Sequence, residues 1–176
     1  MAAFLEQGGH RDRRAAEVQL RLGRGYFAAS DYRNALPRFE AARTAAREPA
    51  LAAEARLWVG RTLLALREFS EAAHELEDVA GDKAAGPLRE QALYTLAELQ
   101  RAAGNAGQAA RAFEECRRQF PEGDYAGAAL FGAASTRELL GDAREARALY
   151  AELVRRRPGS GEAARAAQRL REMDAG

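Results

Sequence analysis

The sequence predicts an all-α fold, an α-solenoid of four helical hairpins followed by a C-terminal capping helix. The main observation is a repeat, because Ala35, Ala72, Ala109 and Ala146 follow one another at intervals of 37 residues. The same interval relates one set of small residues and one set of larger ones: Gly23, Gly60, Ala97 and Ala134, and Phe39, Leu76, Phe113 and Tyr150. A period between about 20 and 50 residues is typical of solenoids and repeat arrays.

One copy of the repeat, from Pro87 to Pro121, has the pattern of a helical hairpin. Apolar residues recur three or four positions apart in 88–103 and again in 108–119, as on one face of an α-helix. Gly104 is suited to the left-handed conformation that ends a helix, and Asn105 to capping the next one. The small residues of the repeat let the two helices approach closely, and the larger ones fill the space beside them.

The elements follow in order from this register. Residues 1–13 form a tail or a degenerate helix, and the tail is favoured because Gly8-Gly9 and the charges after it disfavour a helix. A single domain covers 14–174, with repeats at about 14–49, 51–86, 87–123 and 124–160 and a capping helix at 162–173. We place the turns at Ser30-Asp31, Glu68-Phe69-Ser70, Gly104-Asn105-Ala106-Gly107 and Gly141-Asp142, with Asp31 or Ser30 as the first cap.

The repeat resembles the tetratricopeptide repeat, which spaces a Leu-Gly pair, a Tyr, an Ala, a Phe and a Pro over about 34 residues. The first copy has Leu22-Gly23, Tyr26, Ala35 and Phe39 at these places. A finer pattern, including Gln119-Phe120-Pro121, is similar to the subgroup of bacterial envelope assembly lipoproteins and Tol-Pal-associated proteins. The resemblance implies a scaffold that binds proteins or peptides in a concave groove formed by the first helices of the hairpins.

We can list the expected groove residues from the repeat register. The partner-binding set is Leu20, Arg21, Arg24, Leu57, Trp58, Arg61, Tyr94, Glu98, Phe131 and Ser135. Aromatic and arginine side chains dominate binding hot spots, so a peptide with an apolar anchor and a nearby carboxylate would fit. Two alternatives stay open: the leucines pack between hairpins, or Arg24 and Arg61 pair with Glu17 and Glu54.

Composition argues against other classes of function. With 27 Lys and Arg against 26 Asp and Glu, the net charge of +1 does not suit a protein that coats nucleic acid. No apolar run reaches membrane-spanning length. The chain begins without the apolar core of a signal peptide, which predicts a cytoplasmic protein, or a periplasmic one if a signal or anchor has been removed.

The sequence predicts no enzyme, no cofactor and no metal. Glu71, His74, Glu75 and Asp78 share one helix face, but a zincin motif needs a second histidine. Cys116 stands at a core position of the repeat, so we expect a buried hydrophobe rather than a nucleophile.

The first functional hypothesis is therefore a non-enzymatic adaptor that holds a partner segment in the groove. The alternative is a structural assembly subunit that forms a homo-oligomer, or docks on a larger complex, through its convex face or its N-terminal edge.

Overall fold

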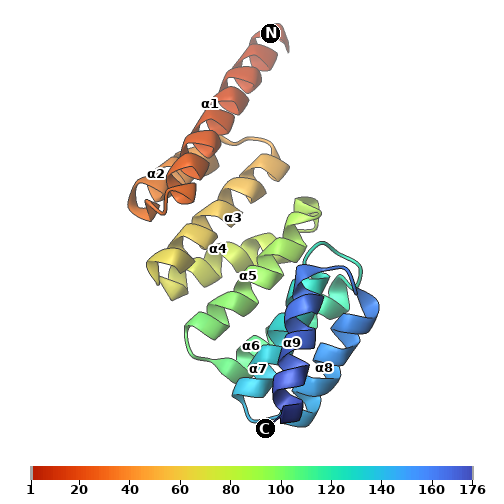
Figure 1. Cartoon of the computed structure of the whole chain (residues 1–176). Helices are drawn as coiled ribbons and strands as arrows, with labels where there is room; N and C mark the ends of the chain where they lie inside the picture. Colours follow the sequence, from red (N-terminus) through yellow and green to blue (C-terminus); the bar gives the residue numbers. More distant parts are fainter. Residues whose placement is uncertain (1, 176) are drawn as a thin grey trace. The chain divides into compact units, whose positions relative to one another are not determined.

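The computed structural model describes the backbone of residues 2–175 and the side chains of residues 12–175, and its described part contains no strand. Figure 1 shows the helices in chain order. They are α1 (Ala2–Ala28), α2 (Tyr32–Ala45), α3 (Pro49–Leu66), α4 (Phe69–Gly81), the short 3-10 helix η1 (Lys83–Ala85), α5 (Leu88–Ala102), α6 (Ala106–Gln119), α7 (Ala126–Leu139), α8 (Ala143–Arg156) and α9 (Gly161–Ala175). The predicted all-α hairpin architecture with a final helix is confirmed.

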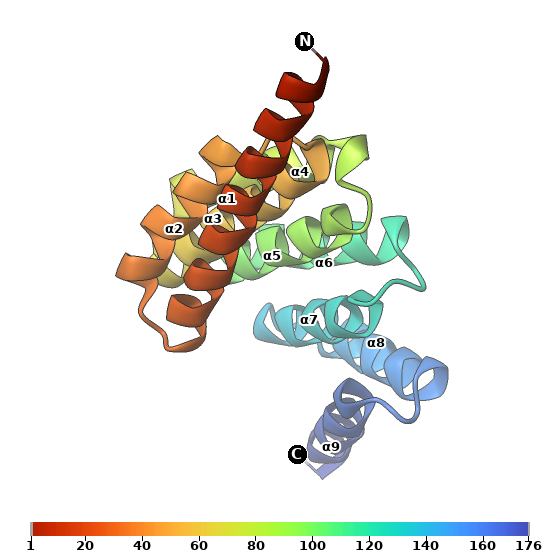
Figure 2. The same ribbon diagram turned by 90° about the horizontal axis from the view of Figure 1, so that it is seen from above.

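The chain consists of two compact units, and the boundary falls inside α5. Unit 1 is Met1–Ala92 and unit 2 is Leu93–Gly176. In unit 1, α1 packs on α2, α2 on α3 and α3 on α4. In unit 2, α6 packs on α7, α7 on α8, and α9 on both α8 and α7. Both views show α7, α8 and α9 beside one another (Figures 1 and 2).

Close contacts explain the small residues of the repeat. A Cβ on Gly23 would lie 2.6 Å from Phe39 Cε1, and one on Gly60 would lie 2.7 Å from Leu76 Cγ. Real Cβ atoms do not approach other atoms so closely, so each glycine makes room for the large residue that the register predicts opposite it.

The turns follow the predicted pattern with two corrections. Gly104 and Gly141 both have a φ of 82°, in the left-handed region, whereas Arg67 occupies this region at the second turn with a φ of 67°. That turn is therefore Arg67-Glu68, before the predicted Glu68-Phe69-Ser70, because α4 already begins at Phe69. At the third turn, α6 begins at Ala106, inside the predicted turn, and the Asn105 side chain makes no capping bond to it. Asp31 caps α2 as predicted by accepting from the Asn34 N–H.

Residues 2–13 belong to α1 and do not form the favoured tail, while Met1 lies outside the described residues. Gly8-Gly9 does not interrupt this helix. Ion pairs tie the last part of the segment to the first hairpin, because Arg13 lies 2.9 Å from Glu17 and 3.3 Å from Glu48, and Asp12 pairs with Arg47. These ion pairs stabilise α1 at residues 12 and 13.

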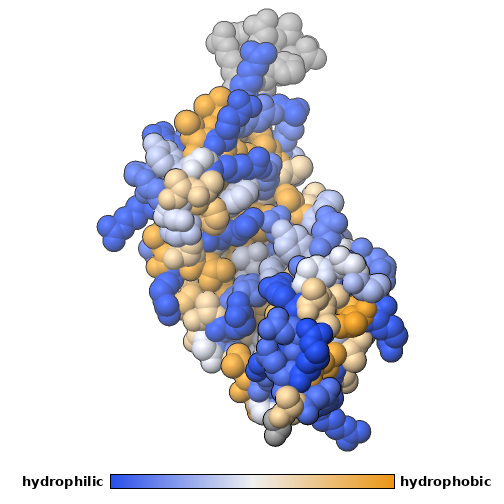
Figure 3. Space-filling model, in the orientation of Figure 1, coloured by the Kyte–Doolittle hydropathy of each residue, from blue (hydrophilic) through white to orange (hydrophobic). Residues whose placement is uncertain are grey.

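The last helix covers the end of unit 2 as expected of a capping helix. Its inner side contributes Ala163 and Ala166, both buried, to the core around Phe113, Tyr150 and Leu153. Its other side carries exposed charged residues, and the surface over α9 in Figure 3 is mainly hydrophilic. Ser160 accepts a hydrogen bond of 3.1 Å from the Ala163 N–H, which places the start of α9 one residue before the predicted one.

Candidate functional site

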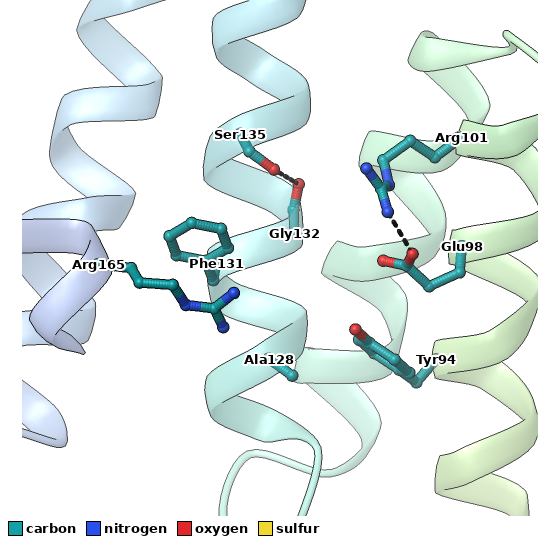
Figure 4. A pocket seen from close by; sticks show the side chains of 8 residues that line it. All are labelled: Tyr94, Glu98, Arg101, Ala128, Phe131, Gly132, Ser135 and Arg165. Carbon is teal, nitrogen blue, oxygen red and sulfur yellow. Dashed lines mark hydrogen bonds and ion pairs between the residues drawn. The ribbon is translucent and has the colours of Figure 1, made fainter. Parts of the chain in front are cut away.

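Unit 2 contains a hollow of about 210 Å³ on the side formed by α5 and α7, which we call the unit 2 hollow (Figure 4). The side chains around it come from three helices. The lining residues are Tyr94, Glu98 and Arg101 from α5, Ala128, Phe131, Gly132 and Ser135 from α7, and Arg165 from α9.

Two half-buried aromatic rings form the apolar part of the hollow. Tyr94 lies 5.8 Å from Phe113 and 5.0 Å from Tyr125, measured between ring centroids, and Phe131 lies 5.5 Å from Tyr150. These contacts hold the rings in place while part of each stays accessible. The site therefore offers rigid apolar surface.

Charged groups stand at both sides of these rings. The Arg165 guanidinium carbon lies 4.6 Å from the centroid of the Phe131 ring, within the range of a cation–π contact. Opposite, Glu98 pairs with Arg101. Burial raises the pKa of the Tyr94 phenol to about 12, and the Glu98 carboxylate contributes to the rise. Arg165 has a weaker carboxylate partner, since Glu162 is 3.7 Å away and on the same helix.

The hollow continues into a second, more open one of about 580 Å³. The two share Arg101, Phe131 and Ser135, and the second adds Glu138, Leu139, Tyr150 and Arg169. Leu139 is 72% exposed. The Tyr150 hydroxyl donates to Glu138 at 3.2 Å and Arg169 Nε donates to the same carboxylate at 3.0 Å. The hydrogen bond from Arg169 lowers the pKa of Glu138, so this carboxylate is already paired.

Gly132 lines the hollow with backbone alone. A Cβ at this position would lie 2.6 Å from Phe113 Cε1, so the fully buried Phe113 ring occupies the space where a side chain would begin. Ser135 is close by on α7 and donates to the Gly132 carbonyl at 3.1 Å. The helix therefore presents backbone and small side chains between Tyr94 and Phe131.

Unit 1 has a different arrangement at the same register. Trp58 stands 74 residues, or two repeats, before Gly132. Its ring stacks on Phe39 with a centroid distance of 5.3 Å and an interplanar angle of 13°, and Phe27 contacts it edge-on at 5.3 Å. The guanidinium carbons of Arg61 and Arg24 lie 4.6 Å and 5.4 Å from the Trp58 ring centroid. Aromatic and arginine side chains thus fill this position.

The structure corrects two of the expected groove residues. Leu20 and Leu57 are only 4% and 2% exposed, so they belong to the core of unit 1 and are not available to a partner. Their apolar character reflects packing between helices, which was one of the alternatives. Arg24 pairs with Glu54 and not with Glu17, and Arg61 lies on aromatic rings, so neither predicted ion pair forms.

The remaining expected residues divide between the two units. Tyr94, Glu98, Phe131 and Ser135 come together in the unit 2 hollow, and Trp58, Arg24 and Arg61 cluster in unit 1, with Arg21 exposed on α1. Sequence reasoning missed Arg101, Ala128 and Arg165, and the expected partner-binding set leaves out Gly132. Gly132 shares a register position with Trp58, which could have identified it, but the contact from Arg165 on α9 has no signal in the repeat.

The described residues offer no metal site. No group of three or more His, Cys, Asp or Glu side chains among them is placed to hold an ion. Glu75 pairs with Arg43 and Asp78 with Arg56, which commits two of the carboxylates near His74. Cys116 is fully buried in unit 2, as predicted. No described helix combines the length and apolar character needed to cross a membrane.

The fold and these surfaces define a helical-repeat protein of hairpin units. Models described as tetratricopeptide repeat match residues 20–87, and 91–123 with 128–160. The chain belongs to the tetratricopeptide repeat family. Repeats of this family suggest a protein–protein interaction adaptor, generally bind proteins or peptides, and are typically non-enzymatic.

Solved structures agree with the fold. A Podospora anserina protein assigned to the kinesin light chains, with nearly identical TPR-like repeats, has a TM-score of 0.72 at 18% identity, covering 89% of this chain and 84% of its own. A point variant of that fungal protein has a TM-score of 0.73 with the same identity and coverage. A TPR-like protein of Chlorobium tepidum has a TM-score of 0.61 at 18% identity, covering 76% of this chain and 99% of its own.

Among curated proteins, none matches the chain. None of the matches above supports the envelope-assembly subgroup, so this finer resemblance stays a prediction.

Proposed function

We propose that the protein is an adaptor that binds a segment of a partner protein in the unit 2 hollow. The observation that carries the proposal is the hollow between the half-buried rings of Tyr94 and Phe131, with Arg165 at its rim. Rigid aromatic surface beside an arginine is the residue chemistry of binding hot spots.

The lining indicates the chemistry of the segment. An apolar side chain of the partner would lie between the two rings over Gly132, where it loses contact with water. Arg165 is held at the rim by the Phe131 ring and has only a weak same-helix pair, so it can meet a carboxylate of the partner. Glu98 and Glu138 are already paired with arginines, which weakens their electrostatic repulsion of that carboxylate.

Photo-crosslinking from the hollow tests this proposal. A benzoylphenylalanine placed at Ser135 in the full chain should crosslink to a defined partner segment in a lysate of the source cells. The matched control carries the same group at Gln108, an exposed residue of α6 outside the lining. Equal crosslinking to the same segment from both positions would contradict a site in the hollow.

Affinity for the crosslinked segment then tests the charge assignment. Arg165→Glu should weaken binding by about tenfold or more, because it replaces attraction by repulsion at the rim. Arg144→Glu makes the same change at an exposed arginine of α8 away from the lining and should leave the affinity within about twofold. Calorimetry on the purified protein measures both, and an unchanged affinity for Arg165→Glu would refute the role of this residue.

A further inference from the structure

The first helix of unit 1 exposes a line of apolar residues on the side away from its core contacts. Within residues 12–28 of α1, the buried residues are Ala16, Leu20 and Gly23. A second line, which we call the α1 seam, consists of Ala15, Val18, Leu22 and Gly25, with Ala29 directly after the end of the helix, all exposed. Val18 and Leu22 are 55% and 45% exposed, and Figure 3 shows hydrophobic surface along α1 below the grey atoms.

The spacing of the α1 seam is that of a helix–helix contact. Its members alternate at three and four residues, the a and d positions of a heptad. Branched residues stand at its centre, and alanine or glycine stands toward both ends, which lets a second backbone approach closely. A helix face that contacts only water usually carries polar residues and not a regular line of apolar ones.

The corresponding positions are buried elsewhere in the molecule. One repeat later, Val18 and Leu22 correspond to Ala55 and Val59 of α3, which are both buried. Three repeats later they correspond to Ala129 and Ala133 of α7, which are also buried. In both cases the second helix of the preceding hairpin packs on the helix that carries these residues, α2 on α3 and α6 on α7. Within residues 12–175 no side chain covers these positions on α1.

Charges beside the α1 seam specify the partner. Arg14 and Arg21 flank it on one side, are both exposed, and pair with no carboxylate among residues 12–175. The α6–α7 interface shows how such a charge is used, because Glu114 of α6 lies 2.6 Å from Arg137 of α7. A helix with acidic residues beside its apolar line would complement both arginines.

A second copy of the chain fits less well. If two α1 helices paired antiparallel around Val18 and Leu22, the flanking positions on that side would bring the Arg21 side chains of both copies together. Like charges at such positions disfavour pairing.

We propose that the α1 seam is a docking site for an amphipathic helix of a partner protein, with acidic side chains flanking its apolar line. This site is separate from the unit 2 hollow and does not depend on the function proposed for it. The partner helix would pack on α1 as α2 packs on α3.

Designed peptides test the proposal with the full chain. One labelled peptide of about three heptads carries Leu and Ala at a and d and Glu at e and g, and its match carries Lys at e and g. Circular dichroism first establishes that both are helical. Fluorescence anisotropy should show binding of the glutamate peptide at least about tenfold tighter than that of the lysine peptide, and weaker binding at high salt.

Variants locate the peptide and separate the alternatives. The double variant Val18→Glu with Leu22→Glu should lose the glutamate peptide, whereas Leu140→Glu, at an exposed leucine outside the lining of both hollows, should retain it. Equal binding of both peptides, binding of neither, or binding unaffected by the double variant would overturn the proposal. So would a concentration-dependent dimer in sedimentation that the double variant abolishes, because the occupant would then be a second copy.

Discussion

Trp58 in unit 1 and Gly132 in unit 2 occupy the same position of the repeat and have opposite effects. Trp58 stacks on Phe39 of the preceding helix and supports two arginines above its ring. Gly132 leaves its place to Phe113 of the preceding helix and lines the unit 2 hollow with backbone alone. One register position thus makes a filled surface in one unit and a recess in the other.

This difference shows that the repeat specifies how the helices pack but not which side chains form the surface. Phe39 and Phe113 are both fully buried at equivalent positions, so the core tolerates either neighbour. Whether a surface can accept an inserted side chain depends on the residue next to that phenylalanine. Substitutions at Trp58 and at Gly132, and the ionisation of Tyr94, test this contrast between the two units.

The largest effect is expected for Trp58→Gly, which gives unit 1 the residue of unit 2. Losing the stacked ring should cost about 3 kcal/mol of the free energy of unfolding, in the range of large aromatic truncations. Glycine inside a helix should cost about 1 kcal/mol more. Urea unfolding followed by circular dichroism measures the sum.

Trp58→Phe is the matched control for that change. It keeps an aromatic ring beside Phe39 and should cost less than about 1.5 kcal/mol. If the glycine and phenylalanine variants were equally stable, the stacking on Phe39 would not support unit 1, and the contrast with Gly132 would fail.

A smaller effect is expected for Gly132→Ala. Alanine normally stabilises a helix relative to glycine, but here its Cβ would lie 2.6 Å from a fully buried ring. Displacing Phe113 should cost about 1–3 kcal/mol, and the helix propensity should return up to about 1 kcal/mol. The net result in urea unfolding is a modest loss of stability.

Gly25→Ala provides the comparison, because a Cβ on Gly25 would meet nothing within 4 Å. This variant should gain about 0.5–1 kcal/mol. A gain of similar size at Gly132 would show that Phe113 moves freely and that the glycine is not needed for packing.

The smallest effect concerns the ionisation of Tyr94 beside the unit 2 hollow. The Trp58 side chain in unit 1 has no group that ionises in this way. The pKa of Tyr94 is raised to about 12, first by burial and then by Glu98. The folded state therefore holds the phenol proton more tightly than the unfolded chain, whose tyrosine pKa is about 10. This contribution to stability is fully present below about pH 10 and is lost as the pH rises toward 12.

Absorbance near 295 nm, as the difference between the wild type and Tyr94→Phe, follows this single group. Glu98→Gln should move its midpoint downward while leaving it above about 10, because burial is the larger cause. A midpoint at the ordinary tyrosine value would mean that the ring is solvated and that the hollow has no rigid wall at Tyr94.

The sequence predicted the scaffold well because the scaffold depends on local and periodic rules. The 37-residue interval identified the glycine opposite each large residue at Gly23 and Gly60, and glycines marked the turns at Gly104 and Gly141. The second turn begins one residue earlier than predicted, because Arg67 takes the left-handed conformation that the sequence pattern assigns to glycine.

The binding surface was harder to predict, because periodicity shows on which face of a helix a residue lies but not whether another helix covers that face. Leu20 and Leu57 follow the groove register and are nevertheless buried by neighbouring helices. Arg165 reaches Phe131 from a helix outside the repeat, and Arg61 finds aromatic rings in place of a carboxylate. Such contacts depend on tertiary packing, which no interval in the sequence encodes.

The chain has one tryptophan and one cysteine, and they lie in different units. Trp58 fluorescence therefore reports on the first unit, while the thiol of the fully buried Cys116 can react with a labelling reagent only when the second unit opens. Two signals native to the sequence, without any engineered dye, can follow each half of this protein separately. Coincident transitions would reveal one cooperative folding unit, and separate transitions would reveal two.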